Sequence, residues 1–277
     1  LDPRLHRPDV RAVAAYIEAH ATSDDVIVLL AGHNAPAFTY YYRGPLPVVA
    51  LPDELLPDTR APLDVRALQD LDAATLGKAQ LWLVLWQAPL ADPTGLITDE
   101  LEHTYPRLGV GRAFHDIALL LFDVRSGPQL AQADMPRTPL RADFLAIDDP
   151  KQTRVRLLGY DLDRQTARAG DTLYLYLYWQ AVAEMQHDYK VFTQLVGPEA
   201  RIVAQHDKIA GAAAYPTSHW PVDAQVRDRF LLTLAADAPP GQYSLIAGLY
   251  RPGKDLTRLR VQGTERDHIV LTQIIVE

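Results

Sequence analysis

Leucine and tyrosine alternate strictly over the six residues from Leu173 to Tyr178, and Trp179 follows them. A period of two residues is that of a β-strand, whose side chains point alternately to opposite faces, and it does not fit one face of a helix. Burial of a leucine side chain is worth about 1.5–3 kcal/mol, so we expect the three leucines to face a hydrophobic core. The tyrosines then form a row on the opposite face, where they pack against another layer or domain, or stack on a ligand.

From about Arg141 onward, short strand-like runs are separated by turn signals such as Ala169-Gly170-Asp171 and Pro239-Pro240-Gly241. This pattern of many short strands with Gly and Pro turns, and without a helical pattern of useful length, predicts a β-sandwich of eight or nine strands. The runs lie at residues 155–163, 172–180, 189–196, 202–206, 229–234, 243–250, 258–261 and 268–276.

Residues 8–124 alternate between helical and strand patterns instead. Val10, Val13, Ala14 and Ile17 have the spacing of one apolar helix face, and residues 26–30 form an uninterrupted apolar run that is typical of a buried parallel strand. We expect further helices at residues 35–43, 64–78 and 94–105, and further strands at residues 47–51, 81–86 and 117–124. Such alternation indicates a layered α/β sheet.

The chain is therefore predicted to be an α+β protein of two domains. An N-terminal α/β domain of Rossmann-like layered type, residues 1–127, precedes an all-β sandwich of Ig-like or jelly-roll-like type, residues 141–277. Residues 128–140 contain Pro128, Pro136 and Pro139, and we expect them to form a linker.

The composition excludes several classes of protein. The 277 residues include no cysteine, which rules out disulfides, cysteine–zinc sites and a thiol nucleophile. The net charge is −8 and the sequence has no run of Lys or Arg, so we expect no nucleic-acid partner. No segment reaches the ~18 consecutive apolar residues of a membrane span. Because the chain begins at Leu1 and not at Met, we expect it to be part of a longer polypeptide.

The sequence holds no recognisable catalytic motif. None of the four serines lies in a G-x-S-x-G elbow, and there is neither a phosphate-binding G-x-x-x-x-G-K-[ST] loop nor an H-E-x-x-H metal motif. Histidine and aspartate are adjacent at several positions, but neighbouring residues on a strand point to opposite faces. We therefore predict no catalytic residue, no metal site and no cofactor.

Polar residues follow the predicted strands of the N-terminal half, and ligands of such sheets gather at the carboxyl ends of the strands. His33 and Asn34 follow the first strand, Asp53 and Glu54 follow the second, and Gln87 follows the third. Two interpretations stay open: a ligand site that includes His33 and Asn34, or local structure in which Asn34 caps a helix.

The C-terminal half offers two further candidate ligand surfaces. Tyr174 and Tyr176 either stack on sugar rings or lie against neighbouring structure, and docking of the α/β domain is the interpretation that we favour. The loop that contains Tyr215, His219 and Trp220 is aromatic and polar, and loops carry binding functions more often than strands do.

A series of motifs in the β half resembles the soluble C-terminal region of large bacterial membrane glycosyltransferases. That family is the dolichyl-phosphate-mannose–protein mannosyltransferase-like group (glycosyltransferase family 39, GT-C class). In the N-terminal half, residues 13–17, 25–28 and 40–42 resemble the segment that follows the last membrane helix of such proteins. The β-half motifs are Leu157-Leu158-Gly159-Tyr160-Asp161-Leu162, Gly170-Asp171-Thr172-Leu173, Leu177-Tyr178-Trp179-Gln180-Ala181, residues 188–195, Pro216-Thr217-Ser218-His219-Trp220, residues 239–243 and Gly248-Leu249-Tyr250.

This sequence also departs from the family pattern. The family tends to have polar residues at the positions of Tyr174 and Tyr176, and a glycine-containing turn where Pro221 to Ala224 stand here. The resemblance implies that the catalytic acidic residues lie in a membrane portion that this sequence does not contain.

The resemblance implies an extracytoplasmic, non-catalytic accessory region, tethered by an N-terminal membrane region of the same polypeptide. Its parent would use a lipid-linked sugar donor, and the region would position or recognise a glycan or protein acceptor. Two alternatives stay open: a free-standing carbohydrate-binding or adhesion module, and, with less support, a hydrolase acting through His33 and Asn34.

Overall fold

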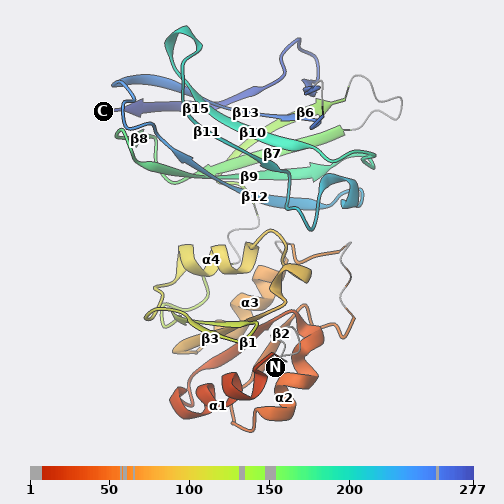
Figure 1. Ribbon diagram of the computed structural model, residues 1–277, viewed down its shortest axis with the longest axis vertical. Helices are drawn as coiled ribbons and strands as arrows, with labels where there is room; N and C mark the ends of the chain where they lie inside the picture. Colours follow the sequence, from red (N-terminus) through yellow and green to blue (C-terminus); the bar gives the residue numbers. More distant parts are fainter. Residues whose placement is uncertain are drawn as a thin grey trace, which may run out of the picture. The chain divides into compact units, whose positions relative to one another are not determined.

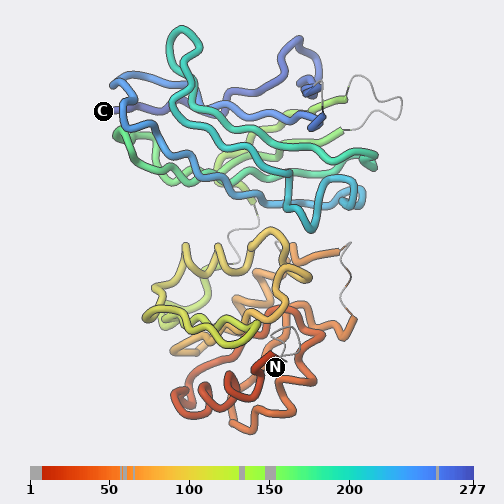
Figure 2. Tube along the Cα trace, viewed as in Figure 1, coloured from red at the N-terminus to blue at the C-terminus, as the bar shows by residue number. Residues whose placement is uncertain are grey.

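Two compact units make up the chain, Leu1–Asp134 and Met135–Glu277. The computed structural model describes residues 8–56, 58, 61–64, 66–130, 135–146, 154–253 and 256–277. In Figure 2 the N-terminal unit runs from red to yellow-green and the C-terminal unit from green to blue. The boundary between the units falls inside the range 128–140, for which the sequence predicts a linker.

The described residues of the N-terminal unit form five strands and four α-helices; Figure 1 labels the helices and β1 to β3. The strands are β1 Val26–Leu30, β2 Val48–Leu51, β3 Gln80–Trp86, β4 Arg112–Phe114 and β5 Ile117–Asp123. The helices are α1 Val10–His20, α2 Ala35–Tyr41, α3 Ala67–Thr75 and α4 Leu96–Thr104, with 3-10 turns η2 Gly32–Asn34 and η3 Ala88–Leu90. The strand order is β2-β1-β3-β5-β4; β1 is parallel to β2 and β3, whereas β5 is antiparallel to β3 and β4.

Helices cover both faces of this sheet, and that explains the uninterrupted apolar run of β1. Ile27 and Leu29 share a hydrophobic cluster with residues of α1 and α2, whereas Val28 and Leu30 share another with residues of α3 and α4. Every residue of β1 is buried as a result. The predicted apolar face of α1 is buried as well, and the helix begins at a side-chain cap, because Asp9 accepts a hydrogen bond from the backbone N–H of Ala12.

The predicted Rossmann-like α/β domain is wrong. The structure as a whole is mostly β, with 41% strand and 19% helix, and the N-terminal sheet is mixed. After α4 the chain runs alongside β5, where the N–H of Leu108 donates to the carbonyl of Leu121 at 2.8 Å. It then turns back at Asp116 (φ 59°), so β5 runs opposite to β3. An apolar run such as 117–124 shows that a strand is buried, but it carries no information about strand direction.

The described residues of the C-terminal unit form two five-stranded sheets, which confirms the predicted β-sandwich. One sheet has the order β12-β9-β7-β6-β14 and the other β11-β10-β13-β15-β8. The strands are β6 Thr138–Leu145, β7 Arg154–Leu162, β8 Thr166–Ala167, β9 Thr172–Ala181, β10 Lys190–Val196, β11 Ile202–Ile209, β12 Gln225–Thr233, β13 Gly241–Tyr250, β14 Arg260–Val261 and β15 Ile269–Val276.

The described part of the sandwich thus has ten strands, two more than the eight runs identified in the sequence. One additional strand is β6, which begins at Thr138, inside the range assigned to the linker. Pro139 had suggested an irregular segment there, but the register of β6 against β7 shifts between Pro139 and Ala142, and this irregularity accommodates the proline. The other is the two-residue β8, which is too short to give a periodic signal.

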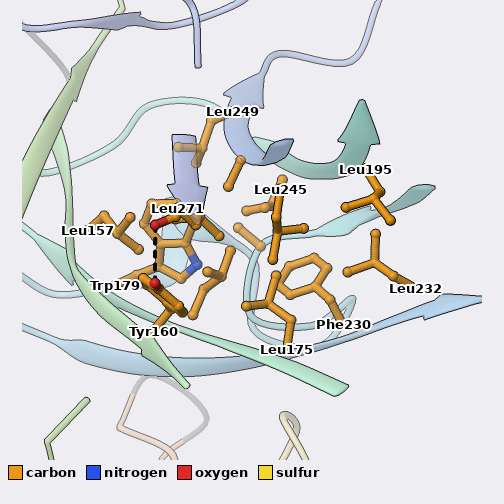
Figure 3. Packing of buried hydrophobic residues seen from close by; sticks show 14 of the residues in the cluster. Leu157, Tyr160, Leu175, Trp179, Leu195, Phe230, Leu232, Leu245, Leu249 and Leu271 are labelled. Carbon is orange, nitrogen blue, oxygen red and sulfur yellow. Dashed lines mark hydrogen bonds between the residues drawn. The ribbon is translucent and has the colours of Figure 1, made fainter. Parts of the chain in front are cut away.

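The leucine face of β9 lies in the sandwich core, as its alternation predicts. Leu173, Leu175, Leu177 and Trp179 are fully buried. Figure 3 shows Leu175 and Trp179 among leucines of both sheets, with the Tyr160 hydroxyl donating to the carbonyl of Leu271 at 3.1 Å. That hydrogen bond satisfies a buried phenol by joining β7 of one sheet to β15 of the other.

Side chains of β11 close the edge of the facing sheet at β12. His206 Nδ1 accepts a hydrogen bond from the backbone N–H of Leu231 at 2.9 Å, and Lys208 Nζ donates to the carbonyl of Arg229 at 3.3 Å. Because an open strand edge would present unpaired backbone groups, these contacts protect β12. Burial, with a further contribution from Lys208, lowers the pKa of His206.

The same edge contains a buried ion pair. Asp228 is completely buried; its carboxylate pairs with Lys208 and also accepts a hydrogen bond from the N–H of Gly211 at 2.9 Å. Burial raises the pKa of Asp228, and the adjacent Lys208 opposes that shift. Removal of one partner of such a pair leaves an uncompensated charge in the interior, so the pair ties β11 to β12.

Candidate functional site

The carboxyl ends of three parallel strands meet at one edge of the N-terminal sheet. β1 ends at Leu30, β2 at Leu51 and β3 at Trp86, and their registers place these ends side by side. Ligand sites of sheets with this connectivity form where strands end, because loops there are free of the ladder and can present polar groups. We call the residues that follow β1, β2 and β3 at this edge the strand-end site.

The residue that directly follows two of these strands has a left-handed backbone conformation although it is not glycine. Ala31 follows β1 with φ 77°, and Gln87 follows β3 with φ 57°. A side chain in this conformation costs on the order of 1–3 kcal/mol, and such strain concentrates at sites that bind or react. Both positions end their strands abruptly and start a 3-10 turn, so the next residues point across the strand ends.

This geometry brings His33 and Gln87 together although 54 positions separate them in the sequence. His33 Nε2 lies 3.0 Å from Gln87 Oε1. Asn34 is buried and donates from Nδ2 to the carbonyl of Trp86 at 3.0 Å, and the same Nδ2 lies 3.5 Å from Gln87 Oε1. The three side chains therefore form one hydrogen-bonded network that joins the ends of β1 and β3.

A pocket lies beside this network. Its space is about 250 Å³ when the part that is open to solvent is included, and it has room for about one water-sized molecule. Gly32 forms part of the wall, and a Cβ atom there would approach the carbonyl oxygen of Pro52 to 1.9 Å, so only glycine fits. The lining residues are Gly32, His33, Pro52, Glu54, Asp58, Ala61, Leu90 and Ala91.

Asp92, next to the pocket residue Ala91, fixes the start of α4. Its carboxylate accepts hydrogen bonds from the N–H groups of Leu96 at 2.8 Å and Ile97 at 2.9 Å, and from the Thr94 hydroxyl at 3.3 Å. Burial raises the pKa of Asp92 to about 6, against the opposing effect of these hydrogen bonds. Asp92 is thus a buried carboxylate that titrates in a mildly acidic range beside the pocket.

Tyr174 and Tyr176 lie on the outer face of the sheet that contains β9, away from the leucines. Tyr174 is 42% exposed, whereas Tyr176 is 6% exposed. The guanidinium of Arg227 lies 3.9 Å from the centre of the Tyr176 ring and 5.7 Å from that of Tyr178, a cation–π arrangement. Of the two predicted platform residues, Tyr174 alone therefore presents an accessible ring.

Two of the three residues predicted in the loop after β11 have a packing role. Tyr215 and Trp220 are buried in the sandwich core, their ring centres are 6.3 Å apart, and Trp220 Nε1 donates to the carbonyl of Tyr215 at 3.1 Å. His219 is exposed. Ligand binding by this loop stays a prediction that depends on His219 and its exposed neighbour Ser218.

The sequence did not single out Gly32, Asp58 or Asp92 for the strand-end site. The Asp92-Pro-Thr-Gly segment before α4 was the available signal, because Asp is a common cap of a helix start. A glycine that approaches a neighbouring carbonyl, in contrast, has no local signature. Asp53, which the sequence placed beside Glu54, is exposed and is not among the pocket residues.

Metal ligands and membrane spans are both absent from the described ranges. No group of three or more His, Cys, Asp or Glu side chains there could hold a metal ion. None of the helices in this part of the chain combines the length and the apolar character that a membrane crossing requires.

Comparison with known proteins gives no family. No family model matches the chain, and no curated protein matches it. Among solved structures, a Niemann-Pick type C2 protein from the Japanese carpenter ant has a TM-score of 0.30 at 4% identity, covering 44% of this chain and 91% of its own. The CARDB domain of the PF1109 protein from Pyrococcus furiosus has a TM-score of 0.28 at 8% identity, covering 50% and 92%.

The sporulation control protein Spo0M from Bacillus subtilis has a TM-score of 0.22 at 16% identity, and covers 44% of this chain and 48% of its own. At TM-scores of this size, these similarities support no argument about fold or function.

Proposed function

We propose that this chain is a non-catalytic recognition region whose strand-end site binds a hydroxyl-bearing ligand of the carbohydrate class. The observation that carries the proposal is the convergence of His33 and Gln87 beside a pocket, produced by two strands that each end in a strained, left-handed residue. If positions 31 and 87 served only to shape the local backbone, glycine would adopt the same left-handed conformation there without that strain.

Two properties of the pocket favour a carbohydrate over a phosphorylated ligand. The described residues that line it include the polar side chains of His33, Glu54 and Asp58, and the two carboxylates repel a phosphate. Leu90 and Pro52 add apolar surface, and sites for small ligands combine such surface with a few placed polar groups.

We also propose that the chain serves as the extracytoplasmic accessory region of a membrane-embedded glycosyltransferase, where it recognises or positions an acceptor glycan or protein. This second statement is supported by the motif series in the β half, which resembles the C-terminal regions of such enzymes. A free-standing carbohydrate-binding or adhesion module would have the same pocket without the membrane portion. Sequencing the gene upstream of Leu1 separates the two: membrane-spanning segments would support the accessory role, and a secretion signal alone would overturn it.

A hydrolytic role of His33 and Asn34 has less support. A histidine base in such enzymes contacts a nucleophile on one side and an orienting group on the other. His33 contacts the amide of Gln87, and Asn34 contacts a main-chain carbonyl, so the pair has the chemistry of a binding site.

Binding itself is tested with the intact chain and a panel of methyl glycosides, followed by NMR chemical-shift changes at residues of the strand-end site. Shifts that saturate and centre on His33 and Gln87 support the proposal. Shifts that centre on Tyr174, or on His219, would move the site to the sandwich. A panel without any saturable shift would refute carbohydrate binding.

A further inference from the structure

A lysine and an aspartate are in contact where β11 of one sheet of the sandwich meets β12 of the other. Asp228 of β12 belongs to a row of side chains that faces the core, because its neighbours on the same face are Val226, Phe230 and Leu232, and all three are buried. The aspartate side chain has no exposed surface. A carboxyl group therefore occupies a position that the alternation of the strand gives to apolar residues.

The two oxygens of the Asp228 carboxyl group have different neighbours. Oδ2 accepts a hydrogen bond from the backbone N–H of Gly211 at 2.9 Å. Oδ1 is in contact with Nζ of Lys208, but no donor among the described residues is aligned to form a hydrogen bond with it. The lysine nitrogen thus lies directly against the carboxyl group, while the second oxygen is held by a backbone donor.

Two further contacts hold the lysine nitrogen in this position. Nζ of Lys208 donates to the carbonyl of Arg229 at 3.3 Å, and it lies 5.2 Å from the centre of the Phe230 ring. Two reacting groups that a fold keeps in contact behave as if their effective concentration were about 10⁵–10⁸ M, provided that their orientation is suitable. Lys208 and Asp228 are therefore placed for a reaction that the free side chains would not undergo in water.

Burial also disfavours the charged forms of this pair. It raises the pKa of Asp228, and the adjacent Lys208 opposes that shift. Transfer of two ions from water to a protein interior is costly, whereas a neutral amide avoids that cost. An amide between the two side chains would remove both charges, and it would join the two strands covalently in a chain that has no cysteine for a disulfide.

We propose that Lys208 and Asp228 form an isopeptide bond, an amide that links β11 to β12. The ion pair is the state that precedes this bond: a proton passes from the ammonium group to the carboxylate, and the neutral Nζ then attacks Cγ. The Nζ–Cγ bond forms, the Cγ–Oδ1 bond breaks, and Oδ1 leaves with two protons as water. The N–H of Gly211 stabilises the negative charge that develops on Oδ2, which remains as the amide oxygen.

Intact-mass spectrometry of the denatured full chain measures this bond directly. We expect most wild-type molecules to be lighter than their sequence by one water molecule, and a tryptic digest to contain a branched peptide in which the chain is not cleaved after Lys208. Lys208→Arg keeps a cation beside Asp228 but has no primary amine, and Asp228→Asn replaces the acid with a less reactive amide. Both variants should have the full mass of their sequences.

Thermal unfolding of the three chains shows whether each one is folded. A folded wild type that has the full mass of its sequence overturns the proposal, whether or not either variant folds. A loss of water that persists in both variants, or a branched peptide that joins other residues, overturns the assignment to Lys208 and Asp228. The proposed ligand site lies in the other unit, so glycoside binding bears on none of these outcomes.

Discussion

The two units use polar side chains at opposite parts of their sheets. In the N-terminal unit, His33, Asn34 and Gln87 gather where strands end, beside a pocket that His33 helps to line. In the sandwich, His206 and Lys208 lie along a strand edge, and both are occupied by the backbone of β12. The difference shows how topology directs polar groups: crossover connections leave strand ends open for ligands, whereas a sandwich has edges that must be covered.

The largest expected effect concerns the strand edge. Lys208→Met removes the cation from the fully buried Asp228, so we expect a loss of about 3–5 kcal/mol in the free energy of unfolding. Urea denaturation of the intact chain, followed by hydrogen exchange in peptides that cover β12, measures it. In an Asp228→Asn background the same Lys208→Met change should cost far less, and equal costs in both backgrounds would show that the ion pair does not hold the edge.

The second effect is a dependence of stability on pH in the N-terminal unit. The pKa of Asp92 is about 6 in the folded state, above its ordinary value of 3.8, so the folded state binds more protons between these pH values. Stability from this group is therefore fully present below pH ~4 and is lost as pH rises through about 6, by roughly 3 kcal/mol in total. Denaturation of the wild type and Asp92→Asn from pH 4 to 7 checks it, since the difference between their slopes isolates this carboxylate.

The third effect distinguishes Gly32, the glycine of the pocket wall, from a glycine whose surroundings are open. Gly32→Ala places a Cβ against the carbonyl of Pro52, and we expect about 1–3 kcal/mol of destabilisation with loss of glycoside binding. Gly253→Ala is the matched control, because a Cβ there meets nothing within 4 Å, and it should change stability by less than about 0.5 kcal/mol. Wild-type affinity in Gly32→Ala would place the ligand elsewhere.

The smallest effect is a dependence of the stability of the sandwich on pH, with the sign opposite to that of the Asp92 effect. Burial and Lys208 lower the pKa of His206 below its ordinary value of 6.5, so its contribution to stability is present above that pH and is lost as pH falls through the folded-state pKa. Protonated Nδ1 no longer accepts from Leu231, and we expect the exchange protection of that amide to fall about five- to tenfold.

Hydrogen exchange measured by NMR at pH 5 and 7.5 tests this response, with rates corrected for intrinsic exchange. His206→Asn retains an acceptor at both pH values and should abolish the difference. A difference of the same size in His206→Asn would exclude the histidine as its source.

Part of the strand-end site could be predicted from the sequence. The apolar run before His33 and Asn34 marks a buried strand, and Gln87 follows another, so all three were expected near one edge. The contact between His33 and Gln87 could not be foreseen, because it depends on the left-handed backbone at Ala31 and Gln87, which are residues without a strong preference for that conformation.

The aromatic residues of the sandwich show a second limit of prediction from the sequence. Tyr215 and Trp220 in a polar loop suggested a binding surface, and yet both rings are buried in the core. Sequence patterns identify which side chains are amphipathic, and only the path of the loop decides whether the ring faces solvent or the interior.

The sequence by itself determined the strand period of β9, the burial of its leucines and the change from helix-containing to all-strand structure along the chain, because side-chain alternation and turn chemistry are local properties. Tertiary structure decided the direction of β5, the pairing of Lys208 with Asp228 and the contact between His33 and Gln87. Each of these depends on groups that are distant in sequence, and their energies arise only when folding places one against the other.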